Sequence, residues 1–181
     1  MRGLVLVGDY FEDTELIATI DVLKRHNEDI TLVSMMKRHE VLSKCGIKYY
    51  VDKLYQDINL DDYDFLFIPG GPGSFKILAF IEEVNQTIKY FYDHDKLISA
   101  ICAAPMLIGR LGYLKNKNYT VYPGFETSII GGNYQKGQGV VQDGKIITGK
   151  SMYYSIDLGL KIIEYFYGEE EKIELEKSLK Q

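Results

Sequence analysis

Three short segments hold residues whose types and spacing could do chemistry, and the first contains a single cysteine, Cys102. In "ISAICAAPM" (residues 98–106) it ends an apolar run and precedes two alanines and a proline. A strand that feeds a helix through small residues can expose a nucleophile on a sharp turn. The free N–H groups of that helix would favour a thiolate and lower the thiol pKa. The alternative is an inert core cysteine, since cysteines are commonly buried.

The second segment is "IPGGPGS" (residues 68–74), a glycine-rich turn directly after an apolar run. Gly70 and Gly71 let the backbone turn closely enough to present an N–H group to an oxyanion, together with the N–H of Ala103. A phosphate cradle is a competing idea. The segment, however, lacks the Gly-Lys-Ser/Thr ending of a P-loop and does not match Gly-x-Gly-x-x-Gly. An ordinary tight turn explains the same residues without chemistry.

The third segment is "FEDTELIAT", which places Glu15 near the start of a predicted helix. An acidic residue at this position commonly caps the helix or offsets its dipole. The functional alternative puts the carboxyl beside the thiol, where it could hydrogen-bond sulfur or move a proton. Glu12 and Asp13 are equally acidic, so the residues alone do not choose among the three.

Alternating strand and helix patterns predict the scaffold for these segments, a single α/β domain with a mostly parallel sheet. The first helix has Asp13 or Thr14 as its N-cap, and residues 41–58 are irregular, with one strand of an excursion at 47–51. Ligands bind beyond the carboxyl ends of parallel strands, where all three segments fall. The expected strands are 4–7, 30–34, 64–68, 96–101 and 119–122, with a hairpin at 139–149 and helices at 13–27, 80–93, 103–111 and 152–166.

Composition excludes several classes of function. The chain has 181 residues, 46% of them hydrophobic, which is enough for one domain with a substantial core. Its net charge is −5, and the densest basic run, Lys37–Arg38–His39, is too short for a nucleic-acid-binding stripe. No segment approaches the roughly 18 apolar residues that span a membrane, and the N-terminal apolar run is too short for a signal peptide. We therefore expect a cytoplasmic protein without nucleic-acid or membrane partners.

The two cysteines, Cys45 and Cys102, make neither a disulfide framework nor a metal-binding motif. No metal or cofactor is expected. Cys45 lies in the irregular segment 41–58 and is interpreted as a bystander thiol. Residues 169–181 form a charged C-terminal tail, frayed or helical, after a domain that covers residues 1–168.

Four segments together resemble the DJ-1/ThiJ/PfpI superfamily, whose fold is related to class I glutamine amidotransferases. They span nearly the whole chain: "EDTELIATIDVLKR", "YDFLFIPGGPGS", "LISAICAAPMLIGRLGYL" and "DGKIITGKSMYYSIDLGLKIIE". The resemblance implies a flavodoxin-like three-layer sandwich, with a mostly parallel central sheet and a β-hairpin excursion. It also implies a homodimer.

The resemblance assigns roles by position. "AICAAP" matches the nucleophile elbow of the family, which makes Cys102 the reactive cysteine in a strained conformation. Glu15, rather than its acidic neighbours, matches the glutamate that contacts the sulfur. Gly71 and Ala103 match the backbone donors of the oxyanion site, and Gly70 is a further pocket candidate.

One position departs from the family pattern. Many members have a His-Pro pair about twenty residues after the cysteine, whereas "TVYPGFETS" places Tyr122 before Pro123. A hydrolytic Cys-His triad is therefore not expected, and peptidase activity loses its main support. Tyr122 and Glu126 are candidates to line the pocket. The chain's three histidines are expected at the surface: His26, His39 and His94.

The resemblance leaves three functional hypotheses. The first is a glyoxalase or deglycase that acts on methylglyoxal or its early adducts, with Cys102 attacking the carbonyl carbon and Glu15 moving protons. The second is an oxidative-stress sensor or chaperone-like protein in which Cys102 is oxidised to a sulfinate. The third, disfavoured by Tyr122, is a cysteine peptidase or amidase. A glutamine amidotransferase is excluded because "ITGKSMYYSIDLG" lacks the histidine of its triad.

Overall fold

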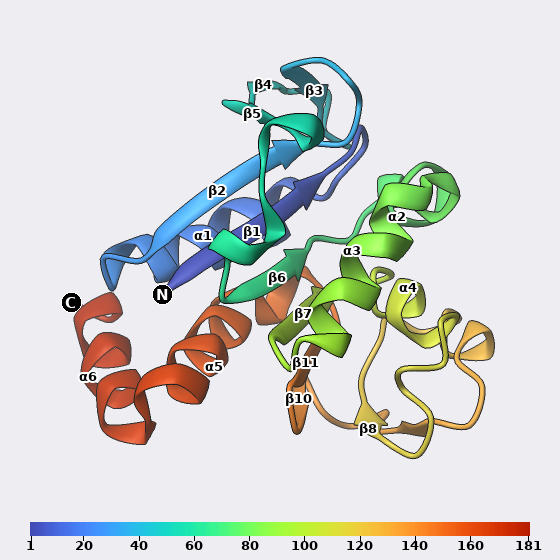
Figure 1. The fold of residues 1–181 in the computed structure, drawn as a ribbon. Coiled ribbons are helices and arrows are strands. Elements are labelled where there is room, and N and C mark those ends of the chain that lie inside the picture. Colours follow the sequence, from blue (N-terminus) through green and yellow to red (C-terminus); the bar gives the residue numbers. More distant parts are fainter.

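A seven-stranded sheet forms the centre of the molecule in the computed structural model, which describes all 181 residues (Figure 1). All strand pairs in it are parallel except β10 with β11. The central strands are continuous apolar runs because both faces of the sheet are covered. In spatial order the strands are β10 (Val140–Asp143), β11 (Ile146–Gly149), β7 (Leu97–Ile101), β6 (Phe65–Ile68), β1 (Arg2–Val7), β2 (Asp29–Ser34) and β5 (Lys53–Leu54).

Helices cover the two faces and complete a three-layer sandwich (Figure 1). Strand β1 shows how the sheet divides the core, because Leu4 and Leu6 join the cluster under α3 while Val5 and Val7 join the cluster under α1 and α5. The predicted fold class is confirmed. The helices are α1 (Asp13–Arg25), α2 (Pro72–Lys76), α3 (Glu82–Asp93), α4 (Pro105–Gly109), α5 (Ser155–Tyr167) and α6 (Glu169–Leu179), with 3₁₀ turns η1 (Tyr55–Asp57), η2 (Leu60–Asp62), η3 (Leu78–Phe80), η4 (Glu126–Ser128) and η5 (Met152–Tyr154).

A small antiparallel hairpin lies outside the main sheet, as the predicted excursion requires. It consists of β3 (Glu40–Leu42) and β4 (Lys48–Tyr50). The loop after β1 holds it in place: the N–H of Tyr10 donates to the carbonyl of Leu42 at 2.6 Å, and the N–H of Leu42 donates to Asp9 Oδ1 at 3.0 Å. The hairpin therefore packs beside the start of α1.

Several element boundaries differ from the prediction, and three of the differences concern the segments around the site. Helix α1 has Glu12 as its N-cap, without a side-chain hydrogen bond, so the predicted cap at Asp13 or Thr14 is wrong. The helix after β7 begins only at Pro105, because the turn at Cys102 must be completed first. The strand predicted at 119–122 shortens to β8 (Asn118–Tyr119), which pairs with β9 (Asn133–Tyr134) outside the main sheet.

The charged C-terminal segment is helical. Gly168 separates α5 from α6 with a φ of 93°, a conformation that favours glycine. Leu175 of α6 is buried in the core cluster under α1 and α5, and His26 at the end of α1 lies 3.4 Å from Glu171. No helix of the structure combines the length and the apolar character needed to cross a membrane.

Candidate functional site

Cys102 lies directly after β7 in a backbone conformation that side-chain-bearing residues rarely adopt. Its φ is 62°, in the left-handed region, which costs about 1 kcal/mol or more for a residue with a Cβ. Its N–H donates to the carbonyl of Gly149 at 2.9 Å, and its own carbonyl accepts the N–H of Tyr122 at 2.8 Å. Neighbouring segments therefore hold the cysteine in this strained turn at the carboxyl end of the sheet strands.

Glu15 reaches the same place from the first turn of α1. It is only 1% exposed, and its Oε2 accepts the N–H of Gly70 at 2.8 Å. A Cβ added at Gly70 would lie 2.6 Å from Cys102 Cβ and 2.7 Å from Glu15 Oε2. The missing side chain of Gly70 is therefore what lets the carboxyl and the thiol approach each other.

The turn after β6 brings backbone donors to the thiol. Gly71 has a φ of 85°, and a Cβ there would meet Glu12 N at 2.6 Å and Tyr10 O at 2.7 Å, so the turn requires glycine. The N–H groups of Gly71 and Ala103 both interact with the Cys102 thiol. The structure thus brings four predicted residues together around the Cys102 sulfur: Glu15, Gly70, Gly71 and Ala103.

The thiol of Cys102 is held in its neutral form. Burial raises its pKa to about 12, helped by the charge and hydrogen bond of Glu15, while the N–H groups of Gly71 and Ala103 oppose the shift. The sequence predicted the opposite direction from the dipole of the following helix. That helix is only five residues long and starts at Pro105, so its dipole is weak at the sulfur.

The carboxyl of Glu15 is partly protonated at neutral pH. Burial raises its pKa from the ordinary 4.5 to about 7, although hydrogen bonds with Cys102 and Gly70 favour the charged form. A group with this pKa both takes and gives a proton near pH 7. At neutral pH the Cys102 sulfur therefore keeps its proton, while the Glu15 carboxyl beside it can gain or lose one.

The remaining predicted residues lie farther from the chemistry. The Tyr122 side chain is 47% exposed, and only its backbone N–H bonds to Cys102. The carboxylate of Glu126 accepts the N–H of Gly124 at 2.6 Å within its own turn. The histidines bond elsewhere: His26 to Glu28, His39 to the Val51 carbonyl and His94 to the Tyr90 carbonyl.

One ion pair beside the site is not predicted by the sequence. Lys44, on the β3–β4 hairpin, places its Nζ 2.7 Å from Oε2 of Glu12, which is 8% exposed and stands one helical turn before Glu15. The Lys44 charge lowers the pKa of Glu15, and the Glu12 charge raises it. No local signal could reveal this pair, because its partners are 32 positions apart.

The nearest approach to a metal-binding cluster joins Glu12, Asp13 and Cys45, whose potential ligand atoms lie within 4.8 Å of one another. Both carboxylates already have partners. Glu12 binds Lys44, and Asp13 accepts the Tyr49 hydroxyl at 3.2 Å.

Comparison with known proteins shows the family to which this chain is related. The DJ-1/PfpI family profile matches residues 1–165. An uncharacterized protein of Methanocaldococcus jannaschii is 35% identical over 89% of this chain and 80% of its own length. A Pyrococcus abyssi protein named as a deglycase is 32% identical over 72% of this chain and 77% of its own. The crystal structure of Drosophila melanogaster DJ-1beta superposes with a TM-score of 0.92 at 27% identity, covering 98% of this chain and 96% of that one. The chain belongs to the DJ-1/PfpI family.

Proposed function

We propose that this protein is a cysteine-dependent enzyme that converts small 2-oxoaldehydes, such as methylglyoxal, into 2-hydroxy acids. One observation carries the proposal: Glu15, buried against the Cys102 thiol, has its pKa raised to about 7. A proton carrier of this kind suits carbonyl addition followed by proton transfer between adjacent carbons. The name of the Pyrococcus abyssi relative, a deglycase, agrees with carbonyl chemistry.

In the first step the sulfur of Cys102 bonds to the aldehyde carbon. The thiol pKa is about 12, so little thiolate exists at pH 7 and a base must take the proton during attack. The carboxylate of Glu15 accepts that proton. The carbonyl π electrons move to oxygen, whose charge faces the N–H groups of Gly71 and Ala103. Protonation of this oxygen gives a hemithioacetal.

In the second step the hemithioacetal isomerises to a thioester. Glu15 removes the hydrogen of the former aldehyde carbon as a proton. The electron pair of that C–H bond forms a carbon–carbon double bond, the π electrons of the neighbouring ketone move to its oxygen, and this oxygen takes the proton to give an enediol. A proton is then added to the former ketone carbon while the hydroxyl on the sulfur-bearing carbon loses its proton, which leaves a 2-hydroxyacyl thioester on Cys102. Water then hydrolyses the thioester, releasing the hydroxy acid and the free thiol. The sum is oxoaldehyde plus water giving hydroxy acid, so no external electron carrier is needed.

A redox role for Cys102 is the second candidate. Two backbone N–H groups and the Glu15 carboxyl surround the sulfur, an arrangement that would also hold the oxygens of a sulfinate. The raised thiol pKa counts against it, because peroxides react with the thiolate. A peptidase is less favoured still, since Tyr122 stands where the family histidine is expected and no histidine bonds near the thiol.

We also propose that the protein is a homodimer in the cytoplasm, where its thiols stay reduced. Large apolar side chains are exposed beside the site on three elements: Ile17 of α1, Ile47 of the hairpin, and Met152 and Ile156 near the start of α5, all 41–51% exposed. Sedimentation equilibrium tests the dimer, and charged substitution of Ile17 should shift it to monomers.

Lactate formation from methylglyoxal tests the enzymatic proposal. The wild-type protein should catalyse it, and Cys102→Ser should reduce kcat/KM by about a thousandfold or more, because an alcohol is a far weaker nucleophile. Cys45→Ser controls for nonspecific thiol chemistry and should stay within about twofold of wild type. Equal rates for wild type and Cys102→Ser would overturn the proposal.

A further inference from the structure

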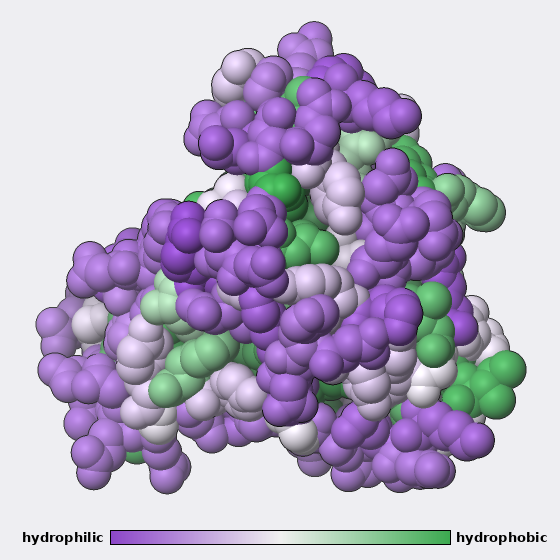
Figure 2. Space-filling view, in the orientation of Figure 1, coloured by the Kyte–Doolittle hydropathy of each residue, from purple (hydrophilic) through white to green (hydrophobic).

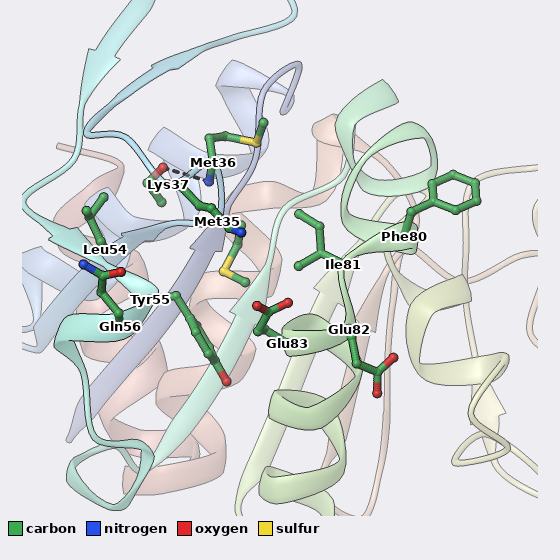
Figure 3. A pocket seen from close by; sticks show the side chains of 11 residues that line it. Met35, Met36, Lys37, Leu54, Tyr55, Gln56, Phe80, Ile81, Glu82 and Glu83 are labelled. Carbon is green, nitrogen blue, oxygen red and sulfur yellow. Dashed lines mark hydrogen bonds between the residues drawn. The ribbon is translucent and has the colours of Figure 1, made fainter.

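A cavity of about 440 Å³ opens on the opposite face of the sheet from Glu15 (Figure 3). It lies at the carboxyl end of β2, between η1 and the start of α3. Neither Cys102 nor Glu15 lines it. Its volume falls in the range of small-molecule sites, and carboxyl ends of parallel strands are where such sites form in α/β sheets.

About half of the residues that line the cavity are apolar, and these form its inner walls. Met35 is 6% exposed, and Figure 3 shows its thioether and the Ile81 side chain both directed into the cavity. Tyr55 forms another wall, held in place by its hydroxyl, which bonds Thr87 Oγ1 at 3.0 Å. Figure 2 shows hydrophobic surface at the bottom of the hollow between the region of β3–β5, at the top of the view, and the α2–α3 region. These walls suit a flat or aliphatic ligand body, since methionine sulfur packs well against aromatic rings.

One carboxylate at the cavity, that of Glu83, has no charged partner. Glu83 carries no ion pair, and in Figure 3 its carboxylate lies beside Tyr55 and Ile81. Glu82 accepts the Asn85 side-chain N–H at 3.1 Å and points away from the cavity. Lys37, exposed at the rim, makes no ion pair either. Glu82 also interacts with the charge of Arg110, so Glu83 is the carboxylate that lies at the cavity wall.

The unpaired Glu83 carboxylate beside an aromatic wall favours a cation. The first turn of α3 has no side-chain cap and would attract an anion by its dipole. Glu82 and Glu83 occupy that turn themselves and satisfy the dipole. A carboxylate or phosphate would have to displace or face both of them, at a cost of like-charge repulsion.

We propose that this cavity binds a small primary amine with an apolar or aromatic body. The body lies against Met35 and Ile81, and the ammonium group binds the Glu83 carboxylate beside the Tyr55 ring, where a cation also interacts favourably with the aromatic face. The site is separate from Cys102 and independent of the proposed carbonyl chemistry.

Methyl NMR of ¹³C-methionine-labelled protein tests this site without a mutation. 2-Phenylethylamine is titrated against two analogues of similar shape, neutral 2-phenylethanol and anionic 3-phenylpropionate. The Met35 methyl resonance should shift saturably with the amine and much less with the alcohol or the acid. The resonance of Met152, 51% exposed on another element, should not move.

Two variants sharpen the result. Glu83→Gln should weaken amine binding by about tenfold or more, whereas Glu82→Gln, the same charge change in the same helical turn, should stay within about threefold. Binding by Cys102→Ser should match wild type. The proposal is overturned if Met35 does not shift saturably, if the alcohol or the acid binds as well as the amine, or if the two glutamine variants behave alike.

Discussion

The two cysteines of this chain show how environment sets the chemistry of one residue type. Cys102 is partly buried and strained at a sheet edge, while Cys45 is exposed near the tip of a hairpin. Each has a carboxylate neighbour from the first turn of α1: Glu15 beside Cys102 and Asp13 beside Cys45. The thiol pKa is raised in both, mainly by burial at Cys102 and mainly by the Asp13 hydrogen bond at Cys45.

The two carboxylates differ more than the two thiols. Burial dominates at Glu15 and raises its pKa to about 7. Burial also raises the pKa of Asp13, but hydrogen bonds from Ser43 and Cys45 outweigh it, so the net shift is downward. Asp13 thus stays charged and inert at neutral pH, whereas Glu15 can exchange a proton. The carboxylate rather than the thiol distinguishes the proposed reactive site at Cys102 from the surroundings of Cys45.

Among changes to the residues that surround the two thiols, the largest expected effect on activity comes from removing the Glu15 carboxylate. Glu15→Gln should lower kcat/KM for methylglyoxal by about 100-fold or more, because the amide cannot carry a proton. The rise of the wild-type rate with pH, centred near 7, should also vanish. Asp13→Asn should change the rate by about threefold at most. Comparable losses in the two variants would erase the distinction between the sites.

The pH dependence of the free energy of unfolding should also differ between variants of Glu15 and variants of Asp13. The raised pKa of Glu15 means that ionisation destabilises the fold as pH rises from 4.5 to about 7. Glu15→Gln should therefore leave stability little changed at pH 4 and increase it by up to about 3 kcal/mol at pH 8. The lowered pKa of Asp13 has the opposite sign: Asp13→Asn should destabilise at neutral pH, with the difference disappearing in acid. Urea unfolding at several pH values measures both, and the same sign in both variants would contradict the account.

Glycine substitutions beside each thiol should differ in a similar way. Gly70→Ala should cost about 1–3 kcal/mol and most of the activity, because its Cβ would press on Cys102, Glu15 and the Ile101 carbonyl. A Cβ at Gly46, next to Cys45, would meet no atom within 4 Å. Gly46→Ala should therefore destabilise the fold by only about 1 kcal/mol, the cost of a φ of 81° for a residue with a Cβ. Thermal unfolding and the lactate assay compare them. Full activity in Gly70→Ala would show that the thiol and carboxyl need not be so close.

The smallest expected effect concerns Lys44. Its charge lowers the pKa of Glu15, so Lys44→Gln should move the midpoint of the pH–rate profile upward by less than about one unit. Exposed Lys48, paired with Glu40 on the same hairpin, provides the control, and Lys48→Gln should not shift the midpoint. A downward shift in Lys44→Gln would contradict the assigned electrostatics.

Local sequence patterns predicted much of the fold and part of the candidate site. Apolar runs predicted the central strands because a sheet covered on both faces needs them, and Asp143–Gly144 predicted the hairpin between β10 and β11. The approach of Gly71 to Cys102 follows from strand ends that meet at one sheet edge. The choice of Glu15 over Glu12 required family resemblance, because local physics treats these carboxylates alike.

The rest depends on contacts between distant segments. The direction of the Cys102 pKa was mispredicted because the extent of its burial and the shortness of α4 are tertiary features. Lys44 reaches Glu12 only because the hairpin packs on the loop after β1. The cavity beside Met35 is assembled from three separate segments, and no single one of them has a recognisable pattern.

The most direct test of the central claim is the titration of Glu15 itself. In protein labelled with ¹³C at glutamate side-chain carboxyls, one resonance that is absent from Glu15→Gln should titrate with a pKa of about 7. The exposed glutamates should titrate near 4 to 5. If the Glu15 resonance also titrates below about 5, the carboxyl is fully charged at neutral pH and cannot be the proton carrier proposed for Cys102.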